Sequence, residues 1–432
     1  MSTHPISASA SRHTGRRARG RDIHEQHRTA TPLELLLDLS FVVAIALAAS
    51  QLHHGVMDHQ TGPALAGFVA AFVAIWWAWM NYTWFASAYD DDSAVFRLLT
   101  LLQMVGVLVF ATGVPGLFSG DFRVGVLGYV VMRLALVVQW LLAARGDPAR
   151  RTTCLRYAGG IALVQLGWVA RLWLAPEWGW PVFVLLMALE MAVPLWAERA
   201  GGTPWHAHHI AERYSLLLII TLGEVVLGAT NAVAAMWQTF GWTLNLALVG
   251  LGSTALVFAL WWMYFLLPSG DALHRHRERS FGWGYGHVAI FVSAAAIGAG
   301  LEVVADVLKA GKEAAEQAIS ATGQAAPVAT QAGHATNAAH GVSPLYAITM
   351  VALAQAMFMV SLWAIYSRTT RAEAGQGLLT LACAACVALG PLAVWLGAAL
   401  PWGLLLLSLG PAIAIVYNER GRRHCTEAFA VR

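Results

Sequence analysis

Acidic side chains within apolar stretches are the residues of this sequence best suited to chemistry. Glu34 and Asp38 are four residues apart, so a helix would place both on one face. Glu224 follows an almost purely apolar run and comes twelve residues after Glu212, a rise of about 18 Å along a helix. An ionised side chain at the bilayer centre costs about 2.5–3.5 kcal/mol on insertion scales, so such acids usually face protein or water. Carboxylates so placed can carry protons or bind small cations.

The charges expected inside apolar stretches do not balance. Glu190 and Glu302 also lie deep in such stretches, whereas Arg133 is the one basic residue expected within a span. One arginine cannot pair with every acid, so some acids must be protonated, hydrated or bound to a cation. We therefore predict that Asp38 and Glu224 face one polar pocket, with Arg133 as their charge partner. The alternative is that Arg133 pairs with one acid and the others bond to backbone or hydroxyl groups.

Other polar residues near helix ends are open to two interpretations each. His209 and Glu212 are three residues apart at a helix start, a spacing that fits a metal or proton site as well as a solvated histidine cluster. Glu212 and Arg213 lie at the membrane interface, where they either cap and anchor the helix or gate a pathway. Asn81 lies in the aromatic run 76–85, where it either lines a cavity or packs among interfacial rings.

The loop 89–93 carries three consecutive aspartates, which either hold a cation at the cytoplasmic mouth or form a solvated acidic loop. The CxxC of Cys383 and Cys386 lies within an apolar helix, where small packing residues are the better interpretation. The sequence has no phosphate-binding glycine loop, no GxSxG and no nucleic-acid module. We therefore expect no cofactor and no nucleic-acid partner.

The composition indicates an all-α polytopic membrane protein. Of the 432 residues, 58% are hydrophobic and 12% are charged, whereas about a quarter of residues are charged in soluble domains. Apolar runs of about twenty residues are long enough to cross a bilayer as helices. We predict about twelve transmembrane helices, at residues 33–52, 64–87, 95–118, 124–144, 155–175, 180–197, 212–232, 243–267, 285–308, 344–366, 377–397 and 399–417.

The basic residues alternate between the two sides of these spans. With the N-terminus in the cytoplasm, most of the 27 lysines and arginines fall in cytoplasmic loops and tails, as the positive-inside rule requires. We therefore predict that both termini are cytoplasmic. The predicted parts are a basic cytoplasmic tail at 1–31, a first six-helix repeat at 32–200, a second six-helix repeat at 201–418 with a long outside loop at 309–342, and a basic cytoplasmic tail at 419–432.

Weak similarity between the two halves predicts parallel repeats. The segment ELLLDLSFVVAIALAAS from Glu34 resembles ERYSLLLIITLGEVVLGAT from Glu212, and each starts with glutamate and carries a second acid further in. Tryptophan pairs follow both segments, at 76–77 and 261–262. Because six spans is an even number, both repeats would share one orientation, and a substrate site would lie between them.

Several segments resemble motifs of the bacterial low temperature requirement A (LtrA) family. They are TPLELLLDLSFVVAIALAASQL, WWAWMNYTWFASAYDDDSAVFRLLTLLQM, YVVMRLALVVQWL and HHIAERYSLLLIITLGEVVLG. The first departs from the family pattern, because Leu36 and Leu37 replace aromatic residues. The resemblance covers roughly residues 28–420 and implies a protein of the bacterial inner membrane, linked by name to growth at low temperature. The family motif residues carried here are Glu34, Asp38, Trp77, Asn81, Asp90, Asp92, Arg97, Arg133, His209, Glu212, Arg213, Gly223 and Glu224.

The first functional hypothesis is a transporter or channel for a small cation or a proton-coupled solute. Asp38 and Glu224 would titrate or contact the cation, and acids nearer the cytoplasm would deliver it. The bilayer and the transported ion or solute would be its partners, with a homo-oligomer also compatible. The candidate pathway residues are Glu34, Asp38, Asn81, Arg133, His209, Glu212, Arg213, Glu224 and Glu302.

Two alternatives stay open, so an enzymatic activity is undecided. One is an intramembrane lipid-modifying enzyme, in which Glu224, His209 and the aspartates at 90–92 act as acid, base or metal ligands. It is favoured if the aspartate loop lies beside His209 and Glu212. The other is a membrane sensor or scaffold that transports nothing, in which every buried acid would be paired.

Overall fold

The regular elements of the chain are all helices in the computed structural model, which describes residues 19–25, 28–322, 341–370 and 374–430. This confirms the predicted all-α class. Ten helical segments within these ranges are long and apolar enough to cross a membrane, so the chain is a multi-pass membrane protein. They correspond to α1 (Pro32–Met57), α2 (Thr61–Tyr89), α3 (Ala94–Ser119), α4 (Arg123–Gly146), α6 (Gly179–Ala197), α7 (Ala207–Phe240), α8 (Leu244–Phe265), α10 (Ser280–Thr322), α12 (Pro344–Thr370), and α15 (Leu400–Leu407) with the start of α16 (Leu409–Ala430).

Two of the twelve predicted stretches lack the length or the apolar character of a span. Residues 155–170 of the stretch predicted at 155–175 lie in α5 (Arg151–Ala170), a helix of 20 residues whose polar side chains include Arg156 and Gln165. The stretch predicted at 377–397 is divided between α13 (Ala374–Cys386) and α14 (Leu389–Trp395). The described residues thus support ten spans, the count of twelve is not confirmed, and the two-repeat arrangement stays a prediction.

Both helix breaks near the C-terminus lie four residues before a proline. Pro391 and Pro411 have no backbone N–H to donate to the carbonyl four residues earlier, and the proline ring crowds that carbonyl. At the second break, the freed carbonyl of Leu407 accepts a 2.7 Å hydrogen bond from Nε2 of Gln355, which is buried in α12. A side chain therefore replaces the lost helical bond, as a backbone within lipid requires.

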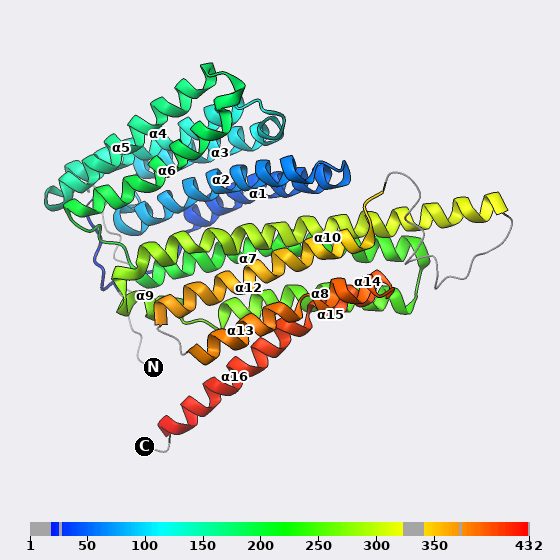
Figure 1. Ribbon diagram of the computed structural model, residues 1–432. Coiled ribbons are helices and arrows are strands. Elements are labelled where there is room, and N and C mark those ends of the chain that lie inside the picture. The colour runs from blue at the N-terminus through cyan, green and yellow to red at the C-terminus, as the bar shows by residue number, and fades with distance from the viewer. Residues whose placement is uncertain (1–18, 26–27, 323–340, 371–373, 431–432) are drawn as a thin grey trace, which may run out of the picture.

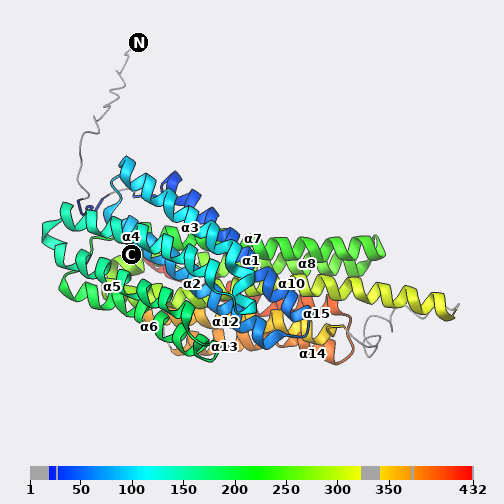
Figure 2. The same cartoon turned by 90° about the horizontal axis from the view of Figure 1, so that it is seen from above.

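The helices run side by side in two groups (Figures 1 and 2). Figure 1 shows α1–α6 on one side of α7 and α10, with α8 and α12–α16 on the other and the short α9 (Ser269–Arg275) at one end. α1 packs against α2 and α3 and also against α7 and α10, so it joins the first group to the second. We call the contact of α1 with α7 and α10 the seam. The predicted acids of α1, α7 and α10 lie along it.

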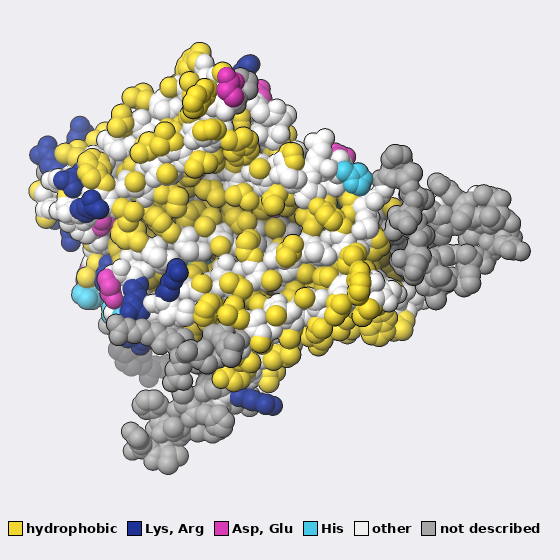
Figure 3. All heavy atoms as spheres, viewed as in Figure 1, with side chains coloured by type: hydrophobic (Ala, Val, Ile, Leu, Met, Phe, Trp, Pro, Cys, Tyr) yellow, Lys and Arg dark blue, Asp and Glu magenta, His cyan; other side chains and the backbone are white. Residues whose placement is uncertain are grey.

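The face of the molecule drawn in Figure 3 has an apolar middle and a basic end. Figure 3 shows hydrophobic side chains over the middle of the visible face, and lysine and arginine side chains gathered at the end where α4 and α5 meet. Exposed apolar side chains include Leu98 of α3 and Leu163 of α5. A wide apolar surface of this kind suits contact with lipid.

Helices extend into segments predicted to lie outside the spans. α10 continues to Thr322, into the predicted outside loop at 309–342, whose residues 323–340 lie outside the described ranges. α16 continues to Ala430, into the predicted tail at 419–432. Most of the predicted tail at 1–31 also lies outside the described ranges.

Candidate functional site

The start of α1 meets the start of α7 through four ionisable side chains, which we call the α1–α7 cluster: Glu34, Asp38, His209 and Arg213. Arg213 Nη2 donates to Asp38 Oδ1 at 2.7 Å, and Trp79 Nε1 of α2 donates to the same oxygen at 2.7 Å. His209 Nε2 lies 3.2 Å from Glu34 Oε1. All four ionisable side chains are fully buried. Residues four apart share a helix face, so the two pairs lie about one turn from each other.

Helix capping holds the chain around this cluster. Thr31 caps α1, and the carboxylate of Glu34 accepts the backbone N–H of Thr31 at 2.8 Å, which completes a capping box. The backbone N–H of Ala30 donates to Glu212 Oε2 of α7 at 3.2 Å. The residues before α1 are therefore bonded to α7. The carboxylate of Glu212 accepts this backbone hydrogen bond at the edge of the cluster.

Several polar atoms of the α1–α7 cluster are buried without a hydrogen-bond partner among the described residues. They include Asp38 Oδ2, His209 Nδ1, and Nε and Nη1 of Arg213. A buried polar group without a partner costs about 1–3 kcal/mol, so this arrangement is expensive as a purely structural support. These donors and acceptors lie beside the Asp38–Arg213 ion pair.

Arg28 links this cluster to the acidic loop between α2 and α3. Its Nη2 atom lies 4.0 Å from Glu34 Oε1 and 3.6 Å from Asp90 Oδ2. Burial raises the pKa of Asp90 above its ordinary value. The neighbouring Asp92 instead accepts two hydrogen bonds from Arg97 at the surface, at 2.9 and 2.7 Å. The structure therefore brings Asp90 to the cluster and leaves Asp92 outside it.

Arg133 of α4 lies in a separate network, which corrects its expected pairing with Asp38 and Glu224. Its Nη2 atom donates to Oε2 of Glu190 in α6 at 2.6 Å, and both side chains are buried. Because α4 and α6 belong to the same helix group, this ion pair closes within that group and away from the seam (Figure 1).

Glu190 is the centre of that network. Its Oε2 also accepts from Trp77 Nε1 at 3.0 Å, and its Oε1 accepts from Gln165 Nε2 at 2.7 Å. Asn81 Oδ1 lies 3.4 Å from Arg133 Nη2, and Asn81 Nδ2 donates to the backbone carbonyl of Trp77 at 2.9 Å. Asn81 therefore supports this ion pair. Glu190 and Gln165 are not among the predicted pathway residues. The position of Glu190 in the middle of a predicted span is the sequence feature that could have identified it.

Arg213 is a second deeply buried cation. The sequence interpretation placed it at the membrane interface, whereas the structure buries it completely against Asp38. The expectation of a single buried arginine was therefore wrong, because the seam supplies its own. The helix that carries Arg213 begins at Ala207, several residues before the predicted start of the span at residue 212. Arg213 therefore lies further inside the helix than the sequence predicts.

The other end of the seam carries a second set of polar side chains, the α1–α10 cluster: His53, Glu224, Glu302 and Asp306. His53 Nε2 lies 2.8 Å from Asp306 Oδ2, and His53 Nδ1 lies 3.8 Å from Glu302 Oε2. Asn231 Nδ2 of α7 lies 3.4 Å from Glu302 Oε1. These side chains are partly exposed. The second cluster is therefore more exposed than the first.

Glu224 lies where α7 and α10 approach each other closely. A Cβ atom added at Gly298 of α10 would lie 2.9 Å from the backbone carbonyl of Glu224. Glu224 is half-buried and has no hydrogen-bond or ion-pair partner among the described residues, although Glu302 interacts with it electrostatically. It lies eleven residues beyond Arg213, about 16 Å along α7. Asp38 and Glu224 thus lie in two clusters on one seam, not around one expected pocket.

The described residues contain no group of three or more His, Cys, Asp or Glu side chains placed to hold a metal ion. His209 and Glu212, whose spacing was open to such a site, have different partners. His209 contacts Glu34, whereas Glu212 accepts a backbone N–H.

Comparison with known proteins identifies the family. The sequence profile described as bacterial low temperature requirement A protein (LtrA) matches residues 29–414. The chain belongs to the LtrA family. The match confirms the resemblance seen in the sequence motifs, and the matched region contains both clusters of the seam.

Beyond the LtrA profile, one curated relative matches part of the chain. It is "Uncharacterized protein RA0937" of Rhizobium meliloti (strain 1021), which is 27% identical over 252 residues. The match covers 56% of this chain and 59% of the relative, so the chain spans less than two thirds of that protein. No solved structure matches the chain.

Proposed function

We propose that this LtrA family protein is a membrane transporter or channel that moves a small cation or a proton-coupled solute along the seam. One observation carries the proposal: histidine contacts carboxylates near both ends of the seam. His209 lies 3.2 Å from Glu34 at one end, and His53 lies 2.8 Å from Asp306 at the other. An imidazole ring can both donate and accept a proton through its two nitrogens, so a histidine beside a carboxylate is suited to proton exchange.

The Asp38–Arg213 ion pair provides a switch on this path. A buried ion pair is held against a large desolvation cost, and here several of its atoms have no other partner in the described residues. A proton or small cation that reaches Asp38 competes with Arg213 for the carboxylate and weakens the pair. Because Arg213 and Glu224 are on the same helix, release of Arg213 alters how α7 packs at Glu224.

The other candidate residues have supporting roles in this scheme. Glu34 and Glu212 lie at the basic end of the seam and deliver or accept the proton there. Glu224 and Glu302 act at the opposite end. Arg133, with Asn81 beside it, holds the first helix group together through Glu190 and stays outside the path.

Flux through proteoliposomes tests the proposal. Glu224→Gln keeps the size of the side chain and removes its charge and its capacity to carry a proton, so we expect flux driven by a proton or cation gradient to fall about 100-fold. Glu278→Gln is the matched control, because Glu278 is an exposed carboxylate away from the seam, and it should transport normally. Wild-type flux in the Glu224→Gln protein would remove Glu224 from the path. No flux of any tested cation or proton by the wild-type protein would contradict the proposal as a whole.

We further propose that the protein lies in the bacterial inner membrane with both termini in the cytoplasm. The basic end of the bundle supports this orientation, because arginine and lysine are retained on the cytoplasmic side of inner-membrane proteins (Figure 3). In this orientation the α1–α7 cluster lies near the cytoplasm, and the α1–α10 cluster lies toward the outside.

One contact favours the alternative of a lipid-modifying enzyme. Through Arg28, Asp90 of the acidic loop belongs to the same buried group as Glu34 and His209. Arg28 itself supplies the positive charge between the two carboxylates. Chemical turnover of bilayer lipids by the purified protein, with no flux, would favour this alternative. A pure scaffold fits less well, because the half-buried Glu224 has no bonding partner among the described residues.

A further inference from the structure

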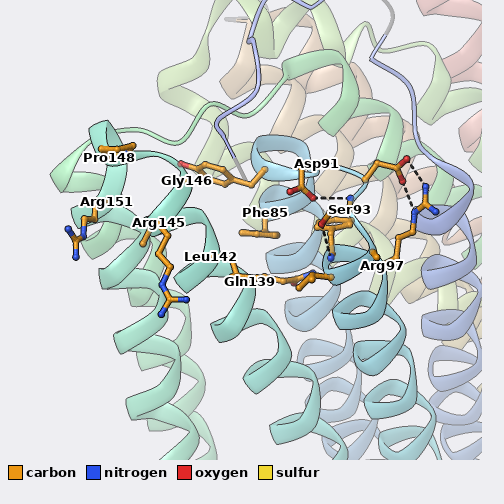
Figure 4. A pocket seen from close by; sticks show the side chains of 16 residues that line it. Phe85, Asp91, Ser93, Arg97, Gln139, Leu142, Arg145, Gly146, Pro148 and Arg151 are labelled. Atoms are coloured by element: carbon orange, nitrogen blue, oxygen red, sulfur yellow. Dashed lines mark hydrogen bonds and ion pairs between the residues drawn. The ribbon is translucent and has the colours of Figure 1, made fainter. Parts of the chain in front are cut away.

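A cavity of about 960 Å³ opens at the basic end of the first helix group. Figure 4 shows that its walls come from the α2–α3 loop on one side and from the α4–α5 turn on the other. The ends of α2, α3 and α4, all candidate membrane spans, meet around it. Because spans end where the hydrocarbon core ends, the cavity lies at the depth of lipid headgroups.

The lining of this cavity is both apolar and charged. Phe85, Phe96 and Leu142 contribute apolar walls, whereas Arg145 and Arg151 contribute positive charge. Figure 4 shows both arginines on the α4–α5 side, across from the acidic loop. The site therefore pairs a hydrophobic surface with a cationic edge, as an amphipathic ligand requires.

The acids of the cavity do not neutralise these two arginines. Asp92 is paired with Arg97 through two hydrogen bonds, and Asp91 accepts a backbone N–H of its own loop. Arg145 and Arg151 have no hydrogen-bond or ion-pair partner among the described residues, and both are exposed. The cavity thus retains positive charge for a ligand.

We propose that this cavity binds an anionic glycerophospholipid, whose headgroup phosphate contacts Arg145 and Arg151. Guanidinium groups form strong, charge-assisted hydrogen bonds to phosphate, and basic pockets between membrane helices are suited to anionic headgroups. The acyl chains lie against the exposed apolar faces of α3 and α4, among them Leu98, Leu102 and Leu141. The site is separate from the seam, so it does not depend on the proposed transport.

Native mass spectrometry of the full-length protein, delipidated in detergent, tests this site. The probes are phosphatidylglycerol, phosphatidylethanolamine and inorganic phosphate, each added in a concentration series. We expect phosphatidylglycerol to bind tightest, and the double variant Arg145→Gln/Arg151→Gln to weaken its binding about tenfold or more. The matched control is Arg199→Gln/Arg275→Gln, which removes two exposed arginines from the same basic end and should bind like the wild type.

Three outcomes would overturn the proposal. Equal loss in both double variants would mean that the general positive charge of this end attracts the lipid. Equal affinity for phosphatidylethanolamine would contradict an anionic ligand. Saturable binding of inorganic phosphate with the same dependence on Arg145 and Arg151 would assign the site to a free anion. Thermal unfolding of both double variants, expected at the wild-type temperature because the four arginines are exposed, checks that the fold is intact.

Discussion

At the residue scale, the two most deeply buried arginines, Arg133 and Arg213, have short contacts to carboxylates on neighbouring helices. Arg213 lies 2.7 Å from Asp38 in the seam, and Arg133 lies 2.6 Å from Glu190 in the first helix group. Removing one partner of a buried ion pair leaves the other charge without compensation, whereas replacing both partners by apolar residues of similar size is often neutral. For each ion pair we therefore expect a single substitution to destabilise the protein and an apolar substitution of both partners to be close to neutral.

We predict that Arg213→Leu lowers the free energy of unfolding by about 3–5 kcal/mol, because it leaves the buried Asp38 unpaired. The double variant Arg213→Leu/Asp38→Leu should recover most of this stability while transport stays absent. Unfolding of the purified protein in detergent measures both effects. If the double variant loses as much as the two single variants added together, the two side chains are not energetically coupled.

The acids of the site could be predicted from the sequence, but their partners could not. Glu34, Asp38 and Glu224 stand out because their neighbours are apolar, and a charge in such a stretch needs a special environment. The partner of an intramembrane charge depends on which helices pack together, and hydropathy contains no information on that. For this reason Arg133 is predicted to be the charge partner of Asp38 and Glu224, whereas the structure pairs it with Glu190.

At the scale of elements, α7 and α10 come close together through small residues. A Cβ atom added at Gly228 of α7 would lie 2.6 Å from the carbonyl oxygen of Gly298, and one added at Gly298 would meet the backbone of Glu224. Glycine at such positions allows two membrane helices to approach each other. The position of Glu224 in the seam therefore depends on Gly298.

Gly298→Ala should destabilise the protein by about 1–3 kcal/mol, because the added methyl group meets the backbone of α7 at less than contact distance. Gly282→Ala, in the same helix, is the control, because a Cβ atom at Gly282 meets no atom within 4 Å. That control should be neutral or stabilising by up to about 1 kcal/mol, since alanine favours a helix over glycine. Unfolding measurements on both variants decide the matter, and equal effects would exclude a close approach at Gly298.

The existence of most helices was predictable, whereas their ends and breaks were less so. An apolar window identifies a span by its composition, and it gave the positions of ten spans that the structure supports. The stretch at 377–397 has the composition of a span, but the backbone breaks before Pro391. The alanine-rich segment after residue 309 is predicted to lie outside the spans and to be disordered or loosely helical. α10 continues into it as far as Thr322, because alanine is a strong helix former.

At the scale of the whole molecule, the bundle has a basic end and a long projection at the other. α10 has 43 residues and is about 65 Å long, roughly twice the thickness of the hydrocarbon core. Figure 2 shows α7, α8 and α10 extending past the first helix group. Part of these helices must therefore leave the bilayer on the side opposite the basic end.

Thiol labelling of intact bacteria tests this orientation. In a background without the native cysteines, Asp121→Cys in the α3–α4 turn should react with a membrane-impermeant reagent from outside. Arg199→Cys, which follows α6 at the basic end, should react only after the cells are permeabilised. The opposite pattern would place the basic end outside and reverse the proposed direction of the seam.

The hydrogen bond from Gln355 to the carbonyl of Leu407 has a consequence for biogenesis. Lipid offers no water to replace a missing donor, so the break between α15 and α16 is tolerated only beside the amide of Gln355. α12 precedes α15 along the chain, and so the amide is already in place when the last helices emerge from the ribosome. The last span, formed by α15 and the start of α16, can therefore complete its backbone bonding only by docking onto α12, which makes that docking a late step of assembly.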